Sequence, residues 1–180
     1  MKKLASAFLL VLLAFAGLAA TLPMTVPELA AQSQAVATAE IISLRGATMT
    51  TPAGNFSFIL YRARTLSVLD GTVPAEFNVR VPGRVNGSQV TTLPDSPPLA
   101  VGLRLVLFLK PAAGTAPADA VYEIVGFSEG ALPLIETPGR EPLALLPAGS
   151  AAPSGRRARA RLNDLGTTVK AVRANRGVKP

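Results

Sequence analysis

Short apolar runs that end at turn residues fill the middle of this chain of 180 residues. The clearest run covers residues 76–81, where Phe77, Val79 and Val81 alternate with polar residues. Successive side chains of a strand point to opposite faces, so this run predicts a strand with its apolar side chains on a core and its polar ones in solvent. A chain built from such runs has to pair them in a sheet, and it is therefore predicted to be mainly β.

Five other segments fit strands by their content of β-branched and aromatic residues. The run RLVLFLK is the most hydrophobic of them, which predicts a strand at the centre of the sheet. The sequence PGRVNG predicts a turn after Val81, and ATMTTPAGN predicts the loop between the first two strands. The five segments are residues 35–44, 56–68, 104–110, 120–127 and 131–136.

The second of these segments carries three aromatic residues beside two arginines. Phe56, Phe58 and Tyr61 next to Arg62 and Arg64 resemble in composition the faces on which barrel domains stack nucleic-acid bases. Aromatic residues at a period of two on a strand are more often part of a core, and they predict a strand that is covered on much of both sides. Nucleic acid is therefore not predicted as the partner.

Residues 26–34 are predicted to form a short helix before the first strand. Thr25 and Glu28 stand at the spacing of a capping box, in which each residue satisfies a free N–H of the helix start. Leu29 and Ala30 of this helix would face the body of the protein.

A second helix is predicted over residues 162–175. Leu162, Leu165, Val169 and Val172 recur there at intervals of three and four residues, which is the spacing of an apolar stripe on a helix. Five or six short strands with helices only at the two ends predict a small antiparallel barrel or sandwich.

The first twenty residues have the order of a secretory signal peptide. Lys2 and Lys3 precede the apolar run LASAFLLVLLAFAGLAA, which ends in small residues. We expect cleavage after Ala19 or Ala20; the alternative is an uncleaved anchor in the membrane. Both alternatives place the remainder outside the cytoplasm, either in a periplasm or as a secreted protein.

The predicted domain boundaries follow changes of composition. Residues 1–20 are the signal peptide, 21–137 the β-barrel-like domain, 138–160 a linker rich in Pro, Gly and Arg, and 161–180 a basic amphipathic helix and tail. The repeated Pro and Gly residues of the linker predict a segment without regular structure. The domain is therefore expected to fold without the tail.

The net charge of +7 lies entirely in the tail. Residues 21–150 hold eight Lys and Arg against ten Asp and Glu, so the body is nearly neutral. The tail is predicted to be a solvated, partly helical extension, a contact with anionic lipid or cell-wall polymer, or a contact with nucleic acid. As a further alternative, its apolar residues dock on the barrel and cover an open edge. The cations predicted for an anionic contact are Arg156, Arg157, Arg159, Arg161, Lys170, Arg173 and Arg176.

The chain contains neither histidine nor cysteine. It therefore lacks the commonest general base, the best thiol nucleophile and the usual zinc ligands, and no serine stands in a nucleophile motif. Glu123, Glu129 and Glu136 are spaced as a solvated face rather than as a catalytic pair. The sequence predicts a protein that is not an enzyme, with no catalytic, cofactor-binding or metal-binding residue.

Four segments together resemble a recurrent, poorly characterised β-domain of exported bacterial proteins. They are residues 28–44, LSVLDGTVPAEFNVRVPG, PPLAVGLRLVLFLK and YEIVGFSEGALPL. The same strand order looks distantly like the OB-type barrels of netrin-like modules and tissue inhibitors of metalloproteinases. Those inhibitors depend on disulfides and on an N-terminal cysteine that binds the protease zinc, and this chain has no cysteine.

The resemblance implies an antiparallel OB-like barrel of five or six strands. With the absence of catalytic groups, it favours an exported, non-enzymatic binding or interaction module for an unknown protein or envelope polymer. The alternative function is that of an inhibitor or partner of an extracytoplasmic metalloprotease. The two are distinguished by whether a metalloprotease loses activity when the protein is added.

Overall fold

The computed structural model describes residues 23–51, 54–115, 119–147, 150 and 158–177, so the predicted signal peptide lies outside the described part. No helix within these ranges is long and apolar enough to cross a membrane. The elements in chain order are α2 (Val26–Gln32), β1 (Ala35–Thr51), β2 (Gly54–Asp70), β3 (Glu76–Asn86), β4 (Gln89–Thr92), β5 (Arg104–Pro111), β6 (Val121–Ile124), the 3₁₀ turn η2 (Phe127–Gly130), β7 (Ala131–Ile135), β8 (Leu143–Leu145), β9 (Arg159–Arg161) and α3 (Leu162–Gly177).

The strands of the described residues form one mixed sheet in the order β1-β2-β3-β6-β5-β7-β8-β9, with β4 beside β3. The protein is therefore mainly β, as predicted, but its described residues form nine strands rather than five or six. The additional strands are β4, which forms a hairpin with the end of β3, and β8 and β9, which lie in the region predicted as linker.

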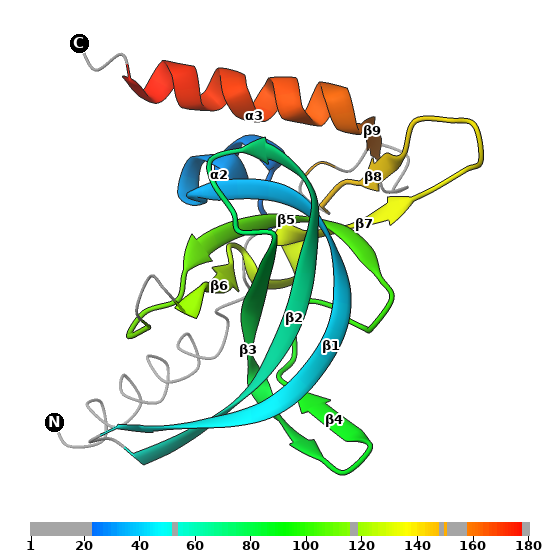
Figure 1. The fold of residues 1–180 in the computed structure, drawn as a ribbon. Coiled ribbons are helices and arrows are strands. Elements are labelled where there is room, and N and C mark those ends of the chain that lie inside the picture. The colour runs from blue at the N-terminus through cyan, green and yellow to red at the C-terminus, as the bar shows by residue number, and fades with distance from the viewer. Residues whose placement is uncertain (1–22, 52–53, 116–118, 148–149, 151–157, 178–180) are drawn as a thin grey trace, which may run out of the picture.

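Five of the strands close into a ring, because β1 pairs with β5 as well as with β2 (Figure 1). All neighbours in the ring are antiparallel except β3 and β6, which run parallel. A closed ring with an odd number of strands cannot alternate direction all the way round, so one parallel pair is unavoidable. The prediction of a wholly antiparallel sheet is wrong for this reason.

Strands β1 and β2 are longer than predicted and strongly curved (Figure 1). The segment ATMTT, predicted as loop, continues β1 because it stays paired with β2 as far as Thr51 and Gly54. The register shifts at three places along this pair, and such bulges bend a strand. The bend lets the first part of β1 close the ring on β5 while the second part extends beyond it.

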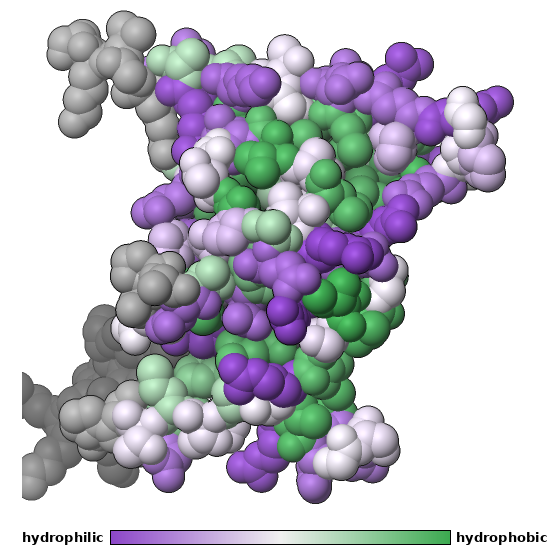
Figure 2. Space-filling view, in the orientation of Figure 1, coloured by the Kyte–Doolittle hydropathy of each residue, from purple (hydrophilic) through white to green (hydrophobic). Residues whose placement is uncertain are grey.

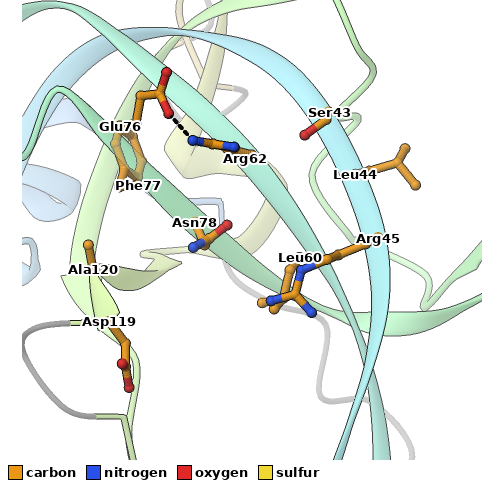
Figure 3. A pocket seen from close by; sticks show the side chains of 10 residues that line it. All are labelled: Ser43, Leu44, Arg45, Leu60, Arg62, Glu76, Phe77, Asn78, Asp119 and Ala120. Atoms are coloured by element: carbon orange, nitrogen blue, oxygen red, sulfur yellow. Dashed lines mark hydrogen bonds and ion pairs between the residues drawn. The ribbon is translucent and has the colours of Figure 1, made fainter.

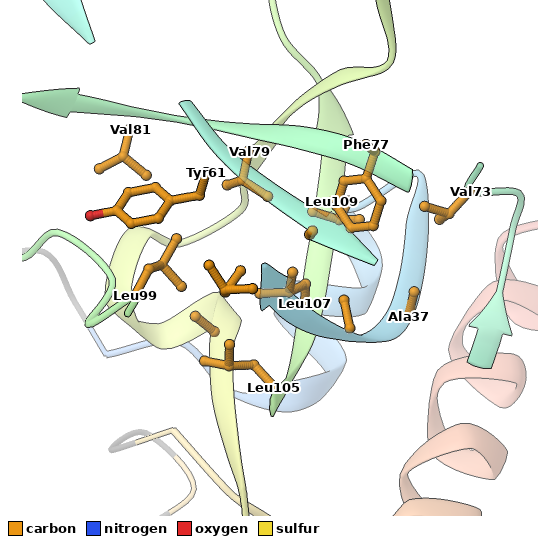
Figure 4. Close-up of a cluster of buried hydrophobic side chains, with 14 of the residues drawn as sticks. Ala37, Tyr61, Val73, Phe77, Val79, Val81, Leu99, Leu105, Leu107 and Leu109 are labelled. Atoms are coloured by element: carbon orange, nitrogen blue, oxygen red, sulfur yellow. The ribbon is translucent and has the colours of Figure 1, made fainter. Parts of the chain in front are cut away.

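The inside of the ring is filled by apolar side chains, which we call the ring core (Figure 4). The alternation predicted for β3 is confirmed, since Phe77, Val79 and Val81 all point into this core and are at most 2% exposed. On β2, Ile59 and Tyr61 are buried in the core, whereas Phe56 on the opposite face is 46% exposed. The prediction that both faces of this strand are covered is therefore wrong at Phe56.

Strand β5 occupies the centre of the sheet, as predicted, and contacts β1, β6 and β7. Residues 105–109 are all fully buried because β5 separates two cores. Leu105, Leu107 and Leu109 enter the ring core, while Val106 and Phe108 enter a second cluster on the other side. This second cluster, the helix core, consists of Val26, Leu29, Ala30, Val36, Val106, Phe108, Val125, Leu132, Ala144, Leu165 and Val169.

The two helices cover the helix core. The predicted N-terminal helix is confirmed as α2, and the Glu28 carboxylate accepts a hydrogen bond of 2.7 Å from the Thr25 N–H. Leu29 and Ala30 are fully buried, as expected. Thr25 thus begins the helix in the way that the capping-box spacing indicated.

The predicted C-terminal helix is confirmed as α3, and it packs on α2 and β2. Leu165 and Val169 of its apolar stripe are buried in the helix core. In Figure 2, hydrophilic side chains follow the helix at the top of the view and apolar ones lie beneath it. The helix therefore packs on the body of the protein, which agrees with the alternative of a docked apolar stripe.

The region predicted as an unstructured linker contains regular structure. Strand β8 pairs with β7 at Leu134 and Ala144, and β9 pairs with β8. The Pro and Gly residues of this segment lie between the short strands instead of excluding them. The backbone N–H and C=O groups of β8 and β9 find partners in the sheet, which outweighs the low strand propensity of the flanking residues.

Ionisation of Tyr61 is expected to destabilise the protein at alkaline pH. Burial in the ring core raises the pKa of the Tyr61 phenol above its ordinary value. The stability that the neutral Tyr61 phenol contributes is fully present below the phenol pKa of the unfolded chain, roughly pH 10. It is lost as the pH rises through the higher pKa of the phenol in the folded protein. Thermal melts at increasing pH should therefore show a smaller alkaline loss in Tyr61→Phe; an equal loss in both proteins would contradict this account.

Candidate functional site

Two cavities lie against the outside of the ring, where the polar faces of β2 and β3 are exposed. Side chains of β2 alternate between the ring core and this face, so Phe58, Leu60 and Arg62 point outward while Ile59 and Tyr61 point inward. On β3 the outward residues include Asn78 and Arg80 for the same reason. We call this surface the outer face.

Cross-strand pairing arranges the outer face in rows. Ser43 of β1 lies opposite Arg62 of β2, which lies opposite Asn78 of β3. The next row consists of Arg45, Leu60 and Arg80. Side chains that are directly opposite in an antiparallel pair stand on the same face, so each row brings three strands to one site.

A bulge in β1 determines that Ser43 and Arg45 belong to this face. Ala39 and Ile41 point into the ring core, and strict alternation would point the side chains of Ser43 and Arg45 into it as well. The register shift between Ile41 and Ser43 inserts Ile42 as an extra residue, so that Leu44 turns to the core. The two polar side chains then face solvent.

The first cavity, which we call the polar cavity, has a volume of about 520 Å³. Figure 3 shows its side chains arriving from three neighbouring strands and from the segment before β6. The Asn78 N–H donates a hydrogen bond of 2.8 Å to the Ala120 carbonyl, which fixes that segment against β3. The lining residues are Ser43, Leu44, Arg45, Leu60, Arg62, Glu76, Phe77, Asn78, Asp119 and Ala120.

The cations of the polar cavity differ in their partners. Arg62 forms an ion pair with Glu76 across β2 and β3, which holds its guanidinium in place (Figure 3). Arg45 is exposed, and the ion pairs found among the described residues do not include it. The guanidinium of Arg45 is therefore the cation at this site that is available to an external group.

The second cavity, which we call the apolar cleft, has a volume of about 310 Å³ and shares no lining residue with the polar cavity. It lies between the outer face and the segment that leads from β4 to β5. Its lining is mostly apolar and rich in proline. The lining residues are Phe58, Arg80, Val81, Pro82, Leu93, Pro94, Ser96, Pro97, Lys110, Glu123, Ile124, Gly126 and Phe127.

One of the aromatic residues of β2 lies on the opposite face from its arginines, which are themselves paired. Tyr61 is in the ring core, whereas Phe58 lines the apolar cleft. Arg62 is paired with Glu76, and Arg64 lies 3.0 Å from a carboxylate oxygen of Glu40. The composition that resembled a base-stacking face thus has one of its three aromatic rings in the ring core and both of its arginines in ion pairs.

The structure places five of the tail cations. Arg159 and Arg161 are exposed on β9, and Lys170 is exposed on α3. Arg173 is directed at the body instead, with its Nε 2.6 Å from Asp70 Oδ2 and its guanidinium donating to the Ser33 carbonyl. Arg176 lies in α3, but its side chain is outside the described part, as are Arg156 and Arg157.

Arg173 therefore has an internal role that the charge pattern did not indicate. It connects α3 to the end of β2 and to the residue after α2. The remaining described tail cations stay candidates for the predicted contact with anionic lipid or polymer.

Glu123 and Glu136, two of the three carboxylates considered for a catalytic pair, have separate surroundings. Glu123 forms ion pairs with Arg80 and Lys110, and Glu136 forms one with Arg104. The hydrogen bond to Glu136 raises the pKa of Arg104, and the charges of Glu136 and Glu40 add to this effect. Among the described residues, no group of three His, Cys, Asp or Glu side chains is placed to hold a metal ion.

Sequence reasoning missed most residues of both cavities. Arg45, Asn78 and Asp119 are separated by long stretches of chain and meet only through strand pairing. The turn glycine at 87 was the available signal for the β3–β4 hairpin, whose exit leads to Leu93 and the apolar cleft.

Comparison with protein families and with curated proteins gives no match to this chain. The residues of the outer face are therefore the basis on which a function is proposed.

Proposed function

We propose that the protein is a non-enzymatic binding module, that its ring is an OB-like barrel, and that the polar cavity binds a segment of an extracytoplasmic glycan. The ring order β1-β2-β3-β6-β5 supports this proposal. OB barrels bind oligonucleotides and oligosaccharides on the face of their second and third strands, between two loops. The polar cavity lies on β2 and β3.

The chemistry of the cavity favours a glycan. Sugar hydroxyl groups both donate and accept hydrogen bonds, so they pair with a wall that offers both kinds of partner. Arg45 and Asn78 supply donors, and the carboxylates of Glu76 and Asp119 supply acceptors. This combination, which β1, β2, β3 and the segment before β6 bring together, is the observation that carries the proposal.

The same cavity is a poor site for single-stranded nucleic acid. Binding of that kind depends on aromatic side chains on which bases stack. The aromatic residue in the lining is Phe77, which is 2% exposed because it fills the ring core. A base would find no exposed ring among the described lining residues.

The predicted signal segment of residues 1–20 agrees with a glycan ligand, because it would deliver the domain to the compartment of envelope polymers. The exposed guanidinium of Arg45 favours glycans that carry carboxylate groups. The alternative of a metalloprotease inhibitor rests on the family resemblance alone, and no feature of the described residues adds to it.

Replacing Arg45 is expected to weaken glycan binding. A hydrogen bond from a charged group contributes about 1.5–3 kcal/mol, so Arg45→Ala should lower the affinity for uronic-acid oligosaccharides by roughly tenfold or more. Isothermal titration of the full chain with neutral and uronic-acid oligosaccharides measures this. Arg84→Ala is the matched control, because Arg84 is also an exposed arginine of this sheet but does not line the cavity.

The proposal is wrong if neither class of oligosaccharide binds, or if Arg84→Ala weakens binding as much as Arg45→Ala. A protein that binds no oligosaccharide but inhibits a metalloprotease would support the alternative function.

A further inference from the structure

The apolar cleft has rigid walls. Pro82, Pro94 and Pro97 contribute rings with restricted backbones, and the Ser128 N–H donates a hydrogen bond of 3.1 Å to the Asp95 carbonyl. That bond ties the segment leading to β5 to η2, on the opposite side of the cleft. The cleft is therefore held open by the fold rather than closed by a loop.

Two residues at the cleft adopt backbone conformations that are unfavourable for them. Asp95 has φ of 64° and Phe127 has φ of 51°, both in the left-handed region. A bulky residue is rarely found there, and such conformations persist where the surrounding structure maintains them. Phe127 is also 54% exposed, so burial of its ring does not compensate for the strained backbone.

The strained conformation places the Phe127 side chain in the lining of the cleft. Leu93, in the facing segment, is 58% exposed. Two large apolar side chains therefore stand at the cleft without a partner among the described residues that buries them. An occupant with an apolar body would cover both.

The polar groups of the cleft carry a net positive charge. Glu123 is shared by Arg80 and by Lys110, whose Nζ lies 3.6 Å from Glu123 Oε2. Two cations and one carboxylate leave an excess of one positive charge. The Arg80 side chain is 9% exposed, stacks at 5.0 Å on the Phe58 ring, and has no hydrogen-bond partner for its Nε among the described residues.

We propose that the apolar cleft binds a small amphiphile with an apolar chain and one carboxylate group. The apolar walls would cover the chain, and the excess positive charge beside Glu123 would attract the carboxylate. The volume of about 310 Å³ is at the lower end of the range for small-molecule sites. The exposed Lys110, with half of its side chain accessible, is the cation that the head group can approach directly.

The lining is less suited to a peptide. A bound peptide must satisfy its backbone N–H and C=O groups, and proline offers no N–H for this purpose. Three of the wall residues are prolines, so a ligand whose body needs no hydrogen bonds fits the cleft better. This site is separate from the glycan site, since the two cavities share no residue.

Titration of the full chain with octanoate, octanol and octylammonium tests the proposal. Octanoate should bind at least tenfold more tightly than octanol, and octylammonium should bind most weakly. Lys110→Gln should reduce the octanoate affinity to near that of octanol without changing the octanol affinity. Phe127→Ala should weaken both ligands, whereas Phe56→Ala, which removes an aromatic ring of similar exposure outside the cleft, should weaken neither.

A further variant separates binding from stability. Glycine adopts the left-handed conformation readily, so Phe127→Gly should raise the melting temperature while it weakens octanoate binding. A purely structural role of Phe127 would give a lower melting temperature instead, and that result would overturn the proposal.

Equal affinity for octanoate and octanol would also overturn the proposal, as would tighter binding of a leucine-ended tripeptide than of octanoate. Arg45 lines the polar cavity and not the apolar cleft, so Arg45→Ala should leave octanoate binding unchanged. The glycan proposal and the amphiphile proposal can therefore fail independently of each other.

Discussion

Removal of residues 158–180 is expected to abolish the cooperative thermal unfolding of this protein. These residues supply Leu165 and Val169 to the helix core, and α3 packs on α2 and β2, so their loss would open that core to solvent. Burial of one such side chain contributes about 1.5–3 kcal/mol, and a whole domain is stable by only about 5–15 kcal/mol. Circular dichroism and differential scanning calorimetry of the truncated chain provide the measurement.

The composition of the chain leads to the opposite expectation, namely that the domain of residues 21–137 folds without its tail. A cooperative transition at an unchanged temperature after the truncation would support that view, and it would show that the helix core does not depend on α3.

A point substitution tests the same interface without removing the helix. Leu165 is 2% exposed, so Leu165→Ala should lower the free energy of unfolding by about 2–5 kcal/mol. Leu66→Ala is the matched control, because Leu66 is 43% exposed and its replacement should change the stability by about 0.5 kcal/mol or less. Similar effects of the two substitutions would show that α3 is only loosely attached.

Gly130→Ala is expected to be the most damaging alanine substitution among the glycines that the structure describes. A Cβ at this position would lie 1.8 Å from the Val125 carbonyl oxygen and 3.0 Å from the Val125 carbonyl carbon. Both contacts are with backbone, so the turn between β6 and β7 would have to move. We expect a loss of roughly 3 kcal/mol or more in chemical denaturation, since overpacking a dense interior costs about 1–3 kcal/mol even where side chains can adjust.

Gly166→Ala is the matched control for that change, and it should change the free energy of unfolding in the opposite direction. Gly166 lies inside α3, and an added Cβ would meet only the Leu69 side chain, at 3.9 Å. Glycine in a helix is less favourable than alanine by about 0.8–1.0 kcal/mol, so the substitution should stabilise the protein by up to about that amount. Destabilisation by Gly166→Ala, or tolerance of Gly130→Ala, would show that the packing around these glycines is looser than these distances indicate.

Several local features of this protein follow from its sequence alone. The alternation in residues 76–81 predicted which side chains of β3 enter the core, and the hydrophobicity of 104–110 predicted a central strand. The capping-box spacing of Thr25 and Glu28 predicted the start of α2. Side-chain periodicity and capping depend on residues within a few positions of one another, so a single sequence contains the information for them.

The ring, the second core and both cavities were decided by tertiary structure. Whether β1 pairs with β5, and whether α3 covers the helix core, depends on the sum of many contacts between distant segments. The composition of the chain does not reveal whether these contacts together favour one arrangement of the strands and helices over another. The parallel pairing of β3 with β6 follows only once five strands have closed a ring.

The candidate site illustrates the difference most directly. From alternation alone, Ser43 and Arg45 would continue the inward face of Ala39 and Ile41, and Arg45 would have no place in a binding site. One extra residue in β1, Ile42, turns both side chains to the outer face beside Leu60 and Arg62. A bulge is set by the pairing of one strand with its neighbour, so the sequence determined which residues could form strands, while the register between those strands decided which side chains meet in the polar cavity.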